Sequence, residues 1–216
     1  MRRFLTEAIP LYEAKGGGKV AVRFALTRIL KQEIEEGAAF DMALMPRSEL
    51  DALAVSGKIV AGSQTDIVRS IVGLMVRTGA PEPDIATVDA FERVLRNAKS
   101  ISFSKGPSGI YVAGLLDRLG LTADMKDKTV FAIGRPVGEV VASGEAEIGM
   151  QQIIENQPVK GAHLVGPLPA ELGNFVPYSG GLSAASAKTA AVGTFMAFLA
   201  SPEAVRIIRD KGMEPA

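Results

Sequence analysis

Short apolar segments alternate along the chain with segments whose apolar residues recur at helical spacing, and this alternation constrains the fold most strongly. Residues 101–104 alternate apolar side chains with serine, which is typical of a strand. The glycines and proline of residues 105–109 favour a turn, and residues 111–120 have helical spacing and end on a glycine. Because such strand–loop–helix units recur, the sequence predicts an α/β fold with mostly parallel sheets. The expected strands are residues 19–24, 40–45, 67–77, 101–104, 129–133, 148–151, 162–165 and 175–184. The expected helices are one that starts at the first residues and is stopped by the glycines at 16–18, and residues 28–36, 48–56, 88–97, 111–120, 136–143, 189–200 and 202–211.

Composition narrows the class of protein. The 24 basic and 24 acidic side chains give a formal net charge of zero, which argues against nucleic acid or an acidic membrane surface as a partner. No apolar run approaches the roughly 18 residues of a membrane span, and the first residues lack the apolar core of a signal peptide. The chain has no cysteine, so disulfides, thiolate metal sites and cysteine nucleophiles are excluded.

The sequence shows no set of residues typical of catalysis. His163 is the only histidine, so neither a histidine metal cluster nor a conventional catalytic triad can be assembled around a second one. There is no G-x-S-x-G elbow, no P-loop and no G-x-G-x-x-G after a strand. We therefore expect no enzyme activity, no metal and no cofactor.

Small or hydroxyl-bearing residues precede three of the expected helices. Thr27 precedes the helix from Arg28, Ser108 and Gly109 precede Ile110, and Pro136 opens the helix with Val137. The unpaired N–H groups of a helix N-terminus attract anions, and in open α/β sheets ligands bind at such loops. The pattern predicts a site for a small anion; three unrelated helix caps are the alternative explanation. Ser48 and Thr87 are expected to cap the helices that follow them.

Five further segments carry a resemblance to a known family. They are residues 56–63, 79–91, 138–149, 164–171 and 211–215, in this order along the chain. With them the chain resembles the periplasmic substrate-binding proteins of ABC transporters, in the branch similar to molybdate-binding proteins. The resemblance covers essentially the whole chain and specifies the family, but no ligand.

The resemblance implies a two-lobed type 2 periplasmic-binding-protein fold with ligand held between the lobes. Lobe one would comprise residues 1–72 and 180–216, and lobe two residues 73–179, with the strands at 67–77 and 175–184 as the two hinge crossings. The family's first strand of lobe one has no counterpart here. Either the gene product begins upstream, or lobe one covers its open sheet edge by forming a homodimer.

The resemblance also implies the ligand-binding residues. Thr27 stands where the family has a serine, Ser108 lies in a loop that supplies a backbone N–H, and Val137 matches another N–H donor. Gln152 replaces the tyrosine of the molybdate branch; its amide brings an acceptor as well as donors, which favours a small organic anion over molybdate. Arg28 and Arg135 flank two of the loops and could pair with a carboxylate. The full expected set is Thr27, Arg28, Ser70, Ser108, Gly109, Ile110, Arg135, Pro136, Val137 and Gln152.

The resulting hypothesis is a solute-binding protein that captures a small anion, an oxyanion or an organic carboxylate, for uptake through an ABC permease. The resemblance implies a periplasmic location, whereas the missing signal peptide leaves the cytoplasm open. The alternatives are a ligand-sensing domain of a regulator and an enzyme on the same scaffold.

Overall fold

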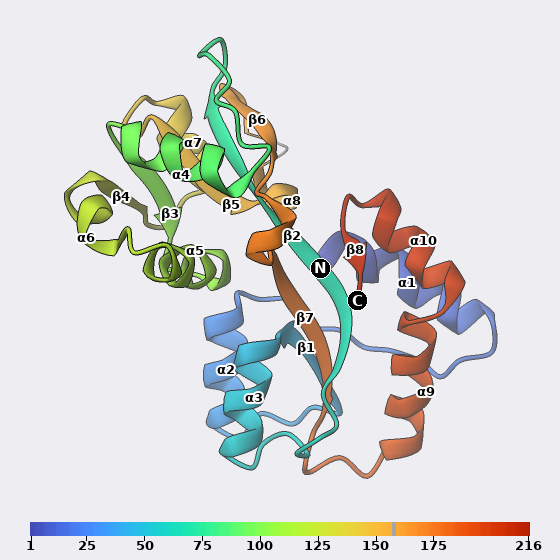
Figure 1. The fold of residues 1–216 in the computed structure, drawn as a ribbon. Helices are drawn as coiled ribbons and strands as arrows, with labels where there is room; N and C mark the ends of the chain where they lie inside the picture. Colours follow the sequence, from blue (N-terminus) through green and yellow to red (C-terminus); the bar gives the residue numbers. More distant parts are fainter. Residues whose placement is uncertain (157–158) are drawn as a thin grey trace. The chain divides into compact units, whose positions relative to one another are not determined.

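The computed structural model describes residues 1–156 and 159–216 (Figure 1). The chain divides into two compact units. Unit 1 comprises Met1–Arg69 and Pro177–Ala216, and unit 2 comprises Ser70–Val176. Two long strands, β2 (Thr65–Arg77) and β7 (Phe175–Leu182), each contain residues of both units.

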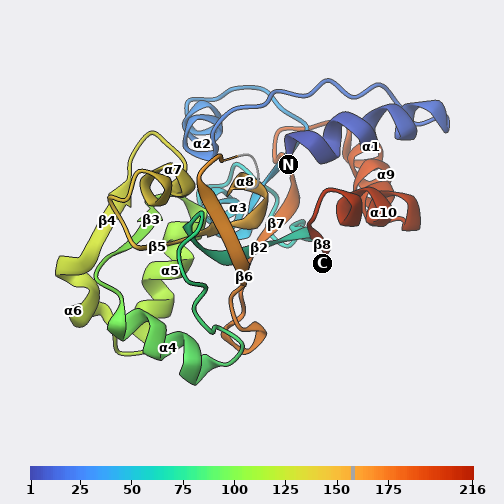
Figure 2. The same cartoon turned by 90° about the horizontal axis from the view of Figure 1, so that it is seen from above.

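Unit 1 is a small antiparallel sheet with helices on both sides. β1 pairs with β7, and the first half of β2 pairs with the short C-terminal strand β8, both antiparallel. Figure 1 shows α2 and α3 on one side of β1 and β7, and α1, α9 and α10 on the other; Figure 2 again shows these last three side by side. The elements are α1 (Arg2–Ala14), α2 (Thr27–Glu35), β1 (Met42–Pro46), α3 (Arg47–Val55), α9 (Thr189–Leu199), α10 (Pro202–Asp210) and β8 (Glu214–Pro215).

Two apolar clusters hold unit 1 together. On the α1 side, Tyr12 packs its ring against Phe195 and Phe198 of α9, with centroids 5.0 Å and 5.2 Å away. Burial of aromatic rings of this size is a large stabilising term, and tilted contacts add to it. On the α2 and α3 side, the buried residues are Ile34, Ala43, Met45, Leu50, Leu53 and Ile59.

Unit 2 contains a mixed sheet, and its central strand, β5, ends in Gln151 and Gln152. β2 lies between β5 and β6 and is antiparallel to both, whereas β3 is parallel to β5 and to β4. α7 packs directly on β5 at Gly149, where a Cβ would lie 2.6 Å from a methyl carbon of Val137. The elements are α4 (Val88–Asn97), β3 (Ile101–Ser104), α5 (Pro107–Arg118), α6 (Thr122–Met125), η1 (Lys126–Lys128), β4 (Thr129–Ala132), α7 (Val137–Ala142), β5 (Ile148–Gln152), α8 (Ile153–Asn156), β6 (Ala162–Pro167) and η2 (Ala170–Leu172).

The fold is therefore mixed α/β, and the expectation of mostly parallel sheets is wrong. Among the described strand pairs only those of β3 are parallel, while β1 with β7 and β2 with β5, β6 and β8 are antiparallel. The alternation of strands and helices indicates crossover connections, but it does not reveal the direction of a long strand that returns between them.

The strand expected at residues 19–24 is also absent. This segment has no regular secondary structure, and among the described residues no strand pairs with it. Its Val20 N–H instead donates to Glu13 Oε1 at 2.9 Å, and Val22 is 44% exposed. A strand needs a neighbouring strand to satisfy its backbone groups, so the alternating pattern alone does not form one here.

Three of the expected helix caps are wrong and one is confirmed. Thr27 is the first residue of α2, Ser48 lies inside α3 and Ser108 is the second residue of α5, and none of these helices has a side-chain cap hydrogen bond. In α5 the proline at position 107 starts the helix one residue before Ser108, because its fixed φ suits the first helical position. Thr87 does cap α4, accepting a hydrogen bond from Ala90 N–H at 3.2 Å.

No single described helix is long and apolar enough to cross a membrane. α9 and α10 reach the required length and composition only as a pair bent by 57°. Buried side chains of both helices, such as Leu199 and Ile208, belong to the core of unit 1.

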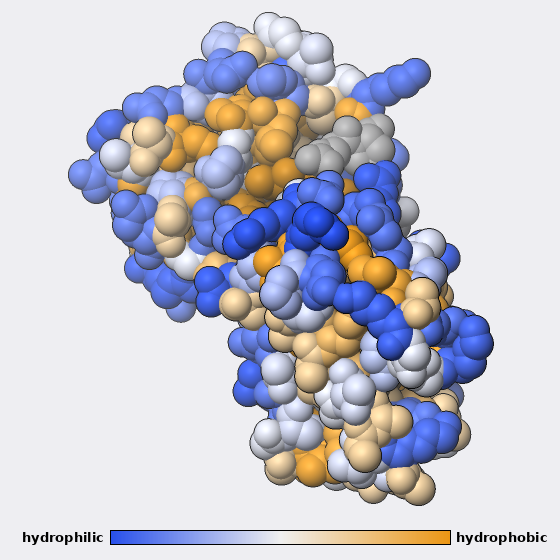
Figure 3. All heavy atoms as spheres, turned by 90° about the vertical axis from the view of Figure 1, so that its right-hand side faces the viewer, coloured by the Kyte–Doolittle hydropathy of each residue, from blue (hydrophilic) through white to orange (hydrophobic). Residues whose placement is uncertain are grey.

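The face of the molecule drawn in Figure 3 mixes hydrophobic and hydrophilic residues.

An ion pair between Lys15 and Glu203 gives unit 1 a testable pH dependence. The hydrogen bond from Lys15 lowers the pKa of Glu203 from 4.5 to about 2. A carboxyl with a depressed pKa stabilises the folded state above its ordinary pKa, and this contribution is lost as the pH falls through the folded value. We expect Glu203→Gln to flatten the loss of unfolding free energy between pH 4.5 and 2, measured by urea denaturation. The exposed Glu171→Gln variant is the control, and equal slopes in wild type and Glu203→Gln would contradict the assignment.

Candidate functional site

Two consecutive glutamines at the end of β5 begin the candidate site. Gln151 is 7% exposed and Gln152 1% exposed. Successive residues of a strand face opposite sides of the sheet, so the two amides serve different neighbours. Ser70, fully buried on β2, donates its hydroxyl to Gln152 Oε1 at 3.0 Å. The structure thus brings together two of the expected residues, Ser70 and Gln152.

Gln151 joins two other elements of unit 2. Its Oε1 accepts a hydrogen bond from Val137 N–H, at the start of α7, at 2.8 Å. Its Nε2 donates to Glu155 Oε2, on α8, at 2.5 Å. Desolvation raises the pKa of Glu155, and the hydrogen bond from Gln151 partly opposes this. The Val137 N–H, expected to face a ligand, is therefore bonded to a side chain of the protein.

The loop between β3 and α5 is shaped by very close packing. Ser104 Oγ accepts the N–H of Gly106, the residue before α5, at 3.1 Å. A Cβ on Gly109 would lie only 1.6 Å from the carbonyl oxygen of Ser104, so the first turn of α5 touches the end of β3. Ser108 is 2% exposed, whereas Ile110 is 59% exposed and donates its own N–H to Gly106 O at 2.9 Å. The Ile110 N–H therefore takes part in a backbone hydrogen bond of α5.

Arg135 and Pro136 lie at the loop before α7. Arg135 is exposed and pairs with Glu145, with 2.5 Å between Nη2 and Oε2. The hydrogen bond from Arg135 lowers the pKa of Glu145, which also accepts from Ser143 Oγ at 2.7 Å. Pro136 is the residue that precedes α7. The charge of Arg135 is thus balanced within the protein.

The remaining expected residues, Thr27 and Arg28, belong to unit 1. Both lie in the first turn of α2, and Arg28 is exposed. A cation near the positive end of a helix dipole is unfavourable for the helix itself. At this position the Arg28 guanidinium attracts anions, but its charge lowers the stability of α2.

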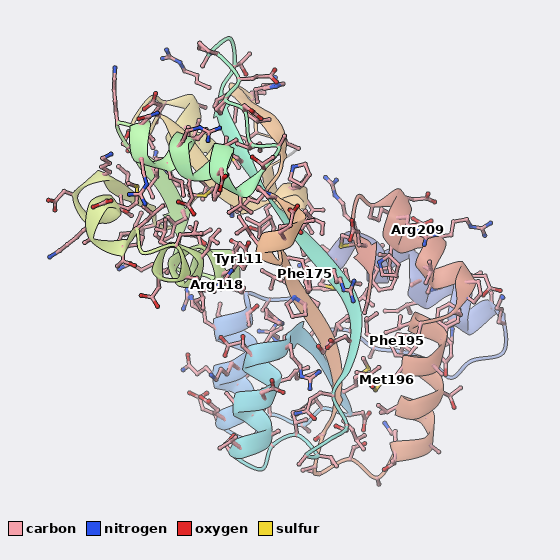
Figure 4. All side chains as sticks on the ribbon, in the orientation of Figure 1. Tyr111, Arg118, Phe175, Phe195, Met196 and Arg209 are labelled. Carbon is pink, nitrogen blue, oxygen red and sulfur yellow. The ribbon has the colours of Figure 1, made fainter. Side chains whose placement is uncertain are left out.

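Tyr111 and Arg118 are seven residues apart on α5 (Figure 4). Both reach the backbone carbonyl of Leu172. Arg118 donates at 3.0 Å and the Tyr111 hydroxyl at 3.4 Å. Burial raises the pKa of Tyr111 to about 12, so its hydroxyl stays protonated and remains a donor. The pair fixes η2 to α5 next to the start of β7.

Sequence reasoning missed Gln151 and Glu155. The available signal was positional: Gln151 ends an expected strand, and Glu155 follows it by four residues. Nothing in the sequence showed that the Gln151 side chain reaches both α7 and Glu155. Among the described residues no group of three or more histidine, cysteine, aspartate or glutamate side chains could hold a metal ion.

Comparison with known proteins identifies the family. Residues 1–214 match the family model of the bacterial extracellular solute-binding proteins, and the chain belongs to this family, as its sequence motifs predict. Its fold is similar to the substrate-binding domain of a putative molybdenum ABC transporter from Clostridium difficile, with TM-score 0.75, 22% identity and coverage of 99% of this chain and 95% of that one. It is also similar to the periplasmic molybdate-binding protein of Azotobacter vinelandii, with TM-score 0.68, 18% identity and coverage of 97% and 93%.

One protein that is similar to this chain in sequence is an enzyme. The chain is 33% identical over 217 aligned residues to an aconitate isomerase from a Pseudomonas species, covering 98% of this chain and 83% of that protein. The expectation that the chain has no enzyme activity is therefore wrong. That expectation rested on the absence of histidine, cysteine and serine nucleophile patterns. An isomerase that moves a proton needs only one suitably placed acid–base group.

Proposed function

We propose that this chain is an isomerase that acts on a small unsaturated polycarboxylate, with aconitate as the first substrate to test. The observation that carries the proposal is the 33% identity to an aconitate isomerase along 98% of the chain. The family supplies the binding scaffold, and the proposal adds turnover of the bound anion.

The candidate site supports a carboxylate ligand. In unit 1, the first turn of α2 with Thr27 and Arg28 offers a cation and backbone N–H groups, which suit carboxylates. Gln152 and Ser70 present an amide and a hydroxyl, groups that both donate and accept hydrogen bonds. This mixture suits a partly protonated organic acid better than an oxyanion such as molybdate.

The proposal includes the two-lobed arrangement expected from the family. Residues 1–72 with 180–216 would form one lobe and residues 73–179 the other, and the segments 67–77 and 175–184 would act as hinges. Closure around the ligand would exclude water during the proton transfer.

Proton NMR tests the proposed function directly. About one protein molecule per hundred molecules of pure cis-aconitate is incubated at neutral pH, and the vinyl and methylene signals are followed. We expect many equivalents of trans-aconitate per protein molecule, whereas heat-unfolded protein produces none. Binding of cis-aconitate without any conversion would contradict the isomerase proposal and leave ligand capture as the role of the chain.

A further inference from the structure

Gln151 and Glu155 form a preorganised pair that no family resemblance pointed to. We propose that Glu155 is the acid–base residue that moves the proton, and that Gln151 is its positioning residue. This inference rests on the proposed isomerase function and names the group that performs its chemistry.

The orientation of the Gln151 amide is fixed by its neighbours. The Val137 N–H can only donate, so the oxygen of the amide must face it, and this bond measures 2.8 Å. The NH₂ group is therefore directed at Glu155, whose Oε2 it meets at 2.5 Å. Because Gln151 is 93% buried, its side chain has little freedom to turn towards water. Gln151 thus holds one oxygen of the Glu155 carboxylate.

The surroundings of Glu155 differ from those of Glu145, a carboxyl of unit 2 that pairs with Arg135. Glu155 is exposed, so a substrate can reach it, yet surrounding protein desolvates its carboxyl and raises its pKa. A general base works best when its pKa approaches the working pH, so this shift favours proton transfer. Four other carboxylates of this unit are bonded to an arginine, to a histidine or to a backbone N–H: Glu82 to His163, Asp124 to Arg96, Glu145 to Arg135 and Glu147 to the N–H of Lys99.

The step can be written with a single carboxylate. Aconitate has a methylene group between a carboxylate and the central carbon of a C=C bond. Glu155 Oε1 takes one methylene proton, the C–H electron pair forms a new C=C bond to the central carbon, and the old π pair moves to the former vinyl carbon. That carbon takes the proton back from the Glu155 carboxyl and becomes the new methylene group. Carboxylate and atom count are restored, and the new double bond adopts the other geometry.

The test compares variants of the full chain in the NMR assay. Glu155→Gln keeps the size and the hydrogen-bonding atoms of the side chain but cannot take a proton, so we expect kcat to fall by about 10²–10⁴-fold with KM little changed. Glu155→Asp retains a carboxyl and is expected to recover part of this loss. Glu147→Gln is the matched control, because Glu147 is an exposed glutamate at the other end of β5 and should retain wild-type kcat.

Gln151→Leu tests the positioning role. Leucine fills a similar volume without holding the carboxylate, so we expect kcat to fall by about 10- to 100-fold while KM stays near the wild-type value. A change in KM alone would show that Gln151 serves binding and would overturn its assignment.

The possible outcomes separate the inference from the proposed function. If wild type and Glu147→Gln interconvert the isomers and Glu155→Gln keeps kcat within threefold of wild type, the Glu155 assignment is wrong and the isomerase stands. If wild type converts neither isomer, the isomerase proposal and the assignment both fail. If Glu155→Gln does not fold, as judged by its thermal unfolding, Glu155→Ala decides instead: a kcat within threefold of wild type would overturn the assignment.

Discussion

Replacing Gly109 by alanine is expected to destabilise the protein by about 4 kcal/mol, near the upper end of single substitutions. The new Cβ would lie 1.6 Å from the carbonyl oxygen of Ser104 and 2.5 Å from its carbonyl carbon. These are backbone atoms, so no side-chain rotation relieves the clash, and either β3 or the first turn of α5 must move. A domain stable by about 5–15 kcal/mol would lose much of its margin. Urea denaturation measures the change.

Gly114→Ala on the same helix is the matched control. Nothing lies within 4 Å of a Cβ at this exposed position, and alanine is favoured over glycine in a helix by about 1 kcal/mol. We therefore expect Gly114→Ala to be neutral or stabilising. Equal stability of the Gly109→Ala and Gly114→Ala variants would show that the contact between β3 and α5 is looser than described.

Gly149→Ala is expected to damage both stability and turnover. Its Cβ would lie 2.6 Å and 2.7 Å from methyl carbons of Val137 and Val141, so α7 must move away from β5. Overpacking of this kind costs about 1–3 kcal/mol. Because Val137 N–H fixes the Gln151 amide, a displaced α7 would also disturb Glu155, and we expect kcat for aconitate to fall about 10-fold or more.

Gly166→Ala provides the comparison for this variant. Gly166 lies on β6, also next to β2, and a Cβ there would have no atom within 4 Å. It should leave both the unfolding free energy and kcat close to wild type. If Gly149→Ala lost stability but kept full kcat, the link from α7 through Gln151 to Glu155 would be contradicted.

The sequence predicted the elements that depend on a local residue pattern. It was less successful where pairing with a distant segment decides whether a strand forms and in which direction it runs. The long apolar run of β2 and the amphipathic helix α4 with its Thr87 cap were both expected from spacing and capping residues. Residues 19–24 show the same alternation as a strand, yet among the described residues no strand pairs with them, and they have no regular secondary structure. The direction of β2 relative to β5 and β6 likewise depends on pairings that no local pattern encodes.

Only part of the candidate site was predicted, because its contacts join segments that are distant in the sequence. Ser70 and Gln152 were expected, and the structure joins them by a hydrogen bond across neighbouring strands. Glu155 was not expected, because its desolvation and its contact with Gln151, on which its proposed role depends, are both products of the folded chain. The expectation of no enzyme activity rested on absent nucleophile motifs, which a reaction that only moves a proton does not need.

The central claim is that a solute-binding fold here converts the anion that it binds, and an approach to equilibrium from both sides tests it most directly. Pure cis-aconitate and pure trans-aconitate are each incubated with the same small amount of wild-type protein, and the isomer ratio is followed by proton NMR. A catalyst changes the rate and leaves the equilibrium alone, so the account predicts that both samples converge on one ratio. Two samples that each keep their starting isomer, while calorimetry shows that the protein binds it, would contradict the account.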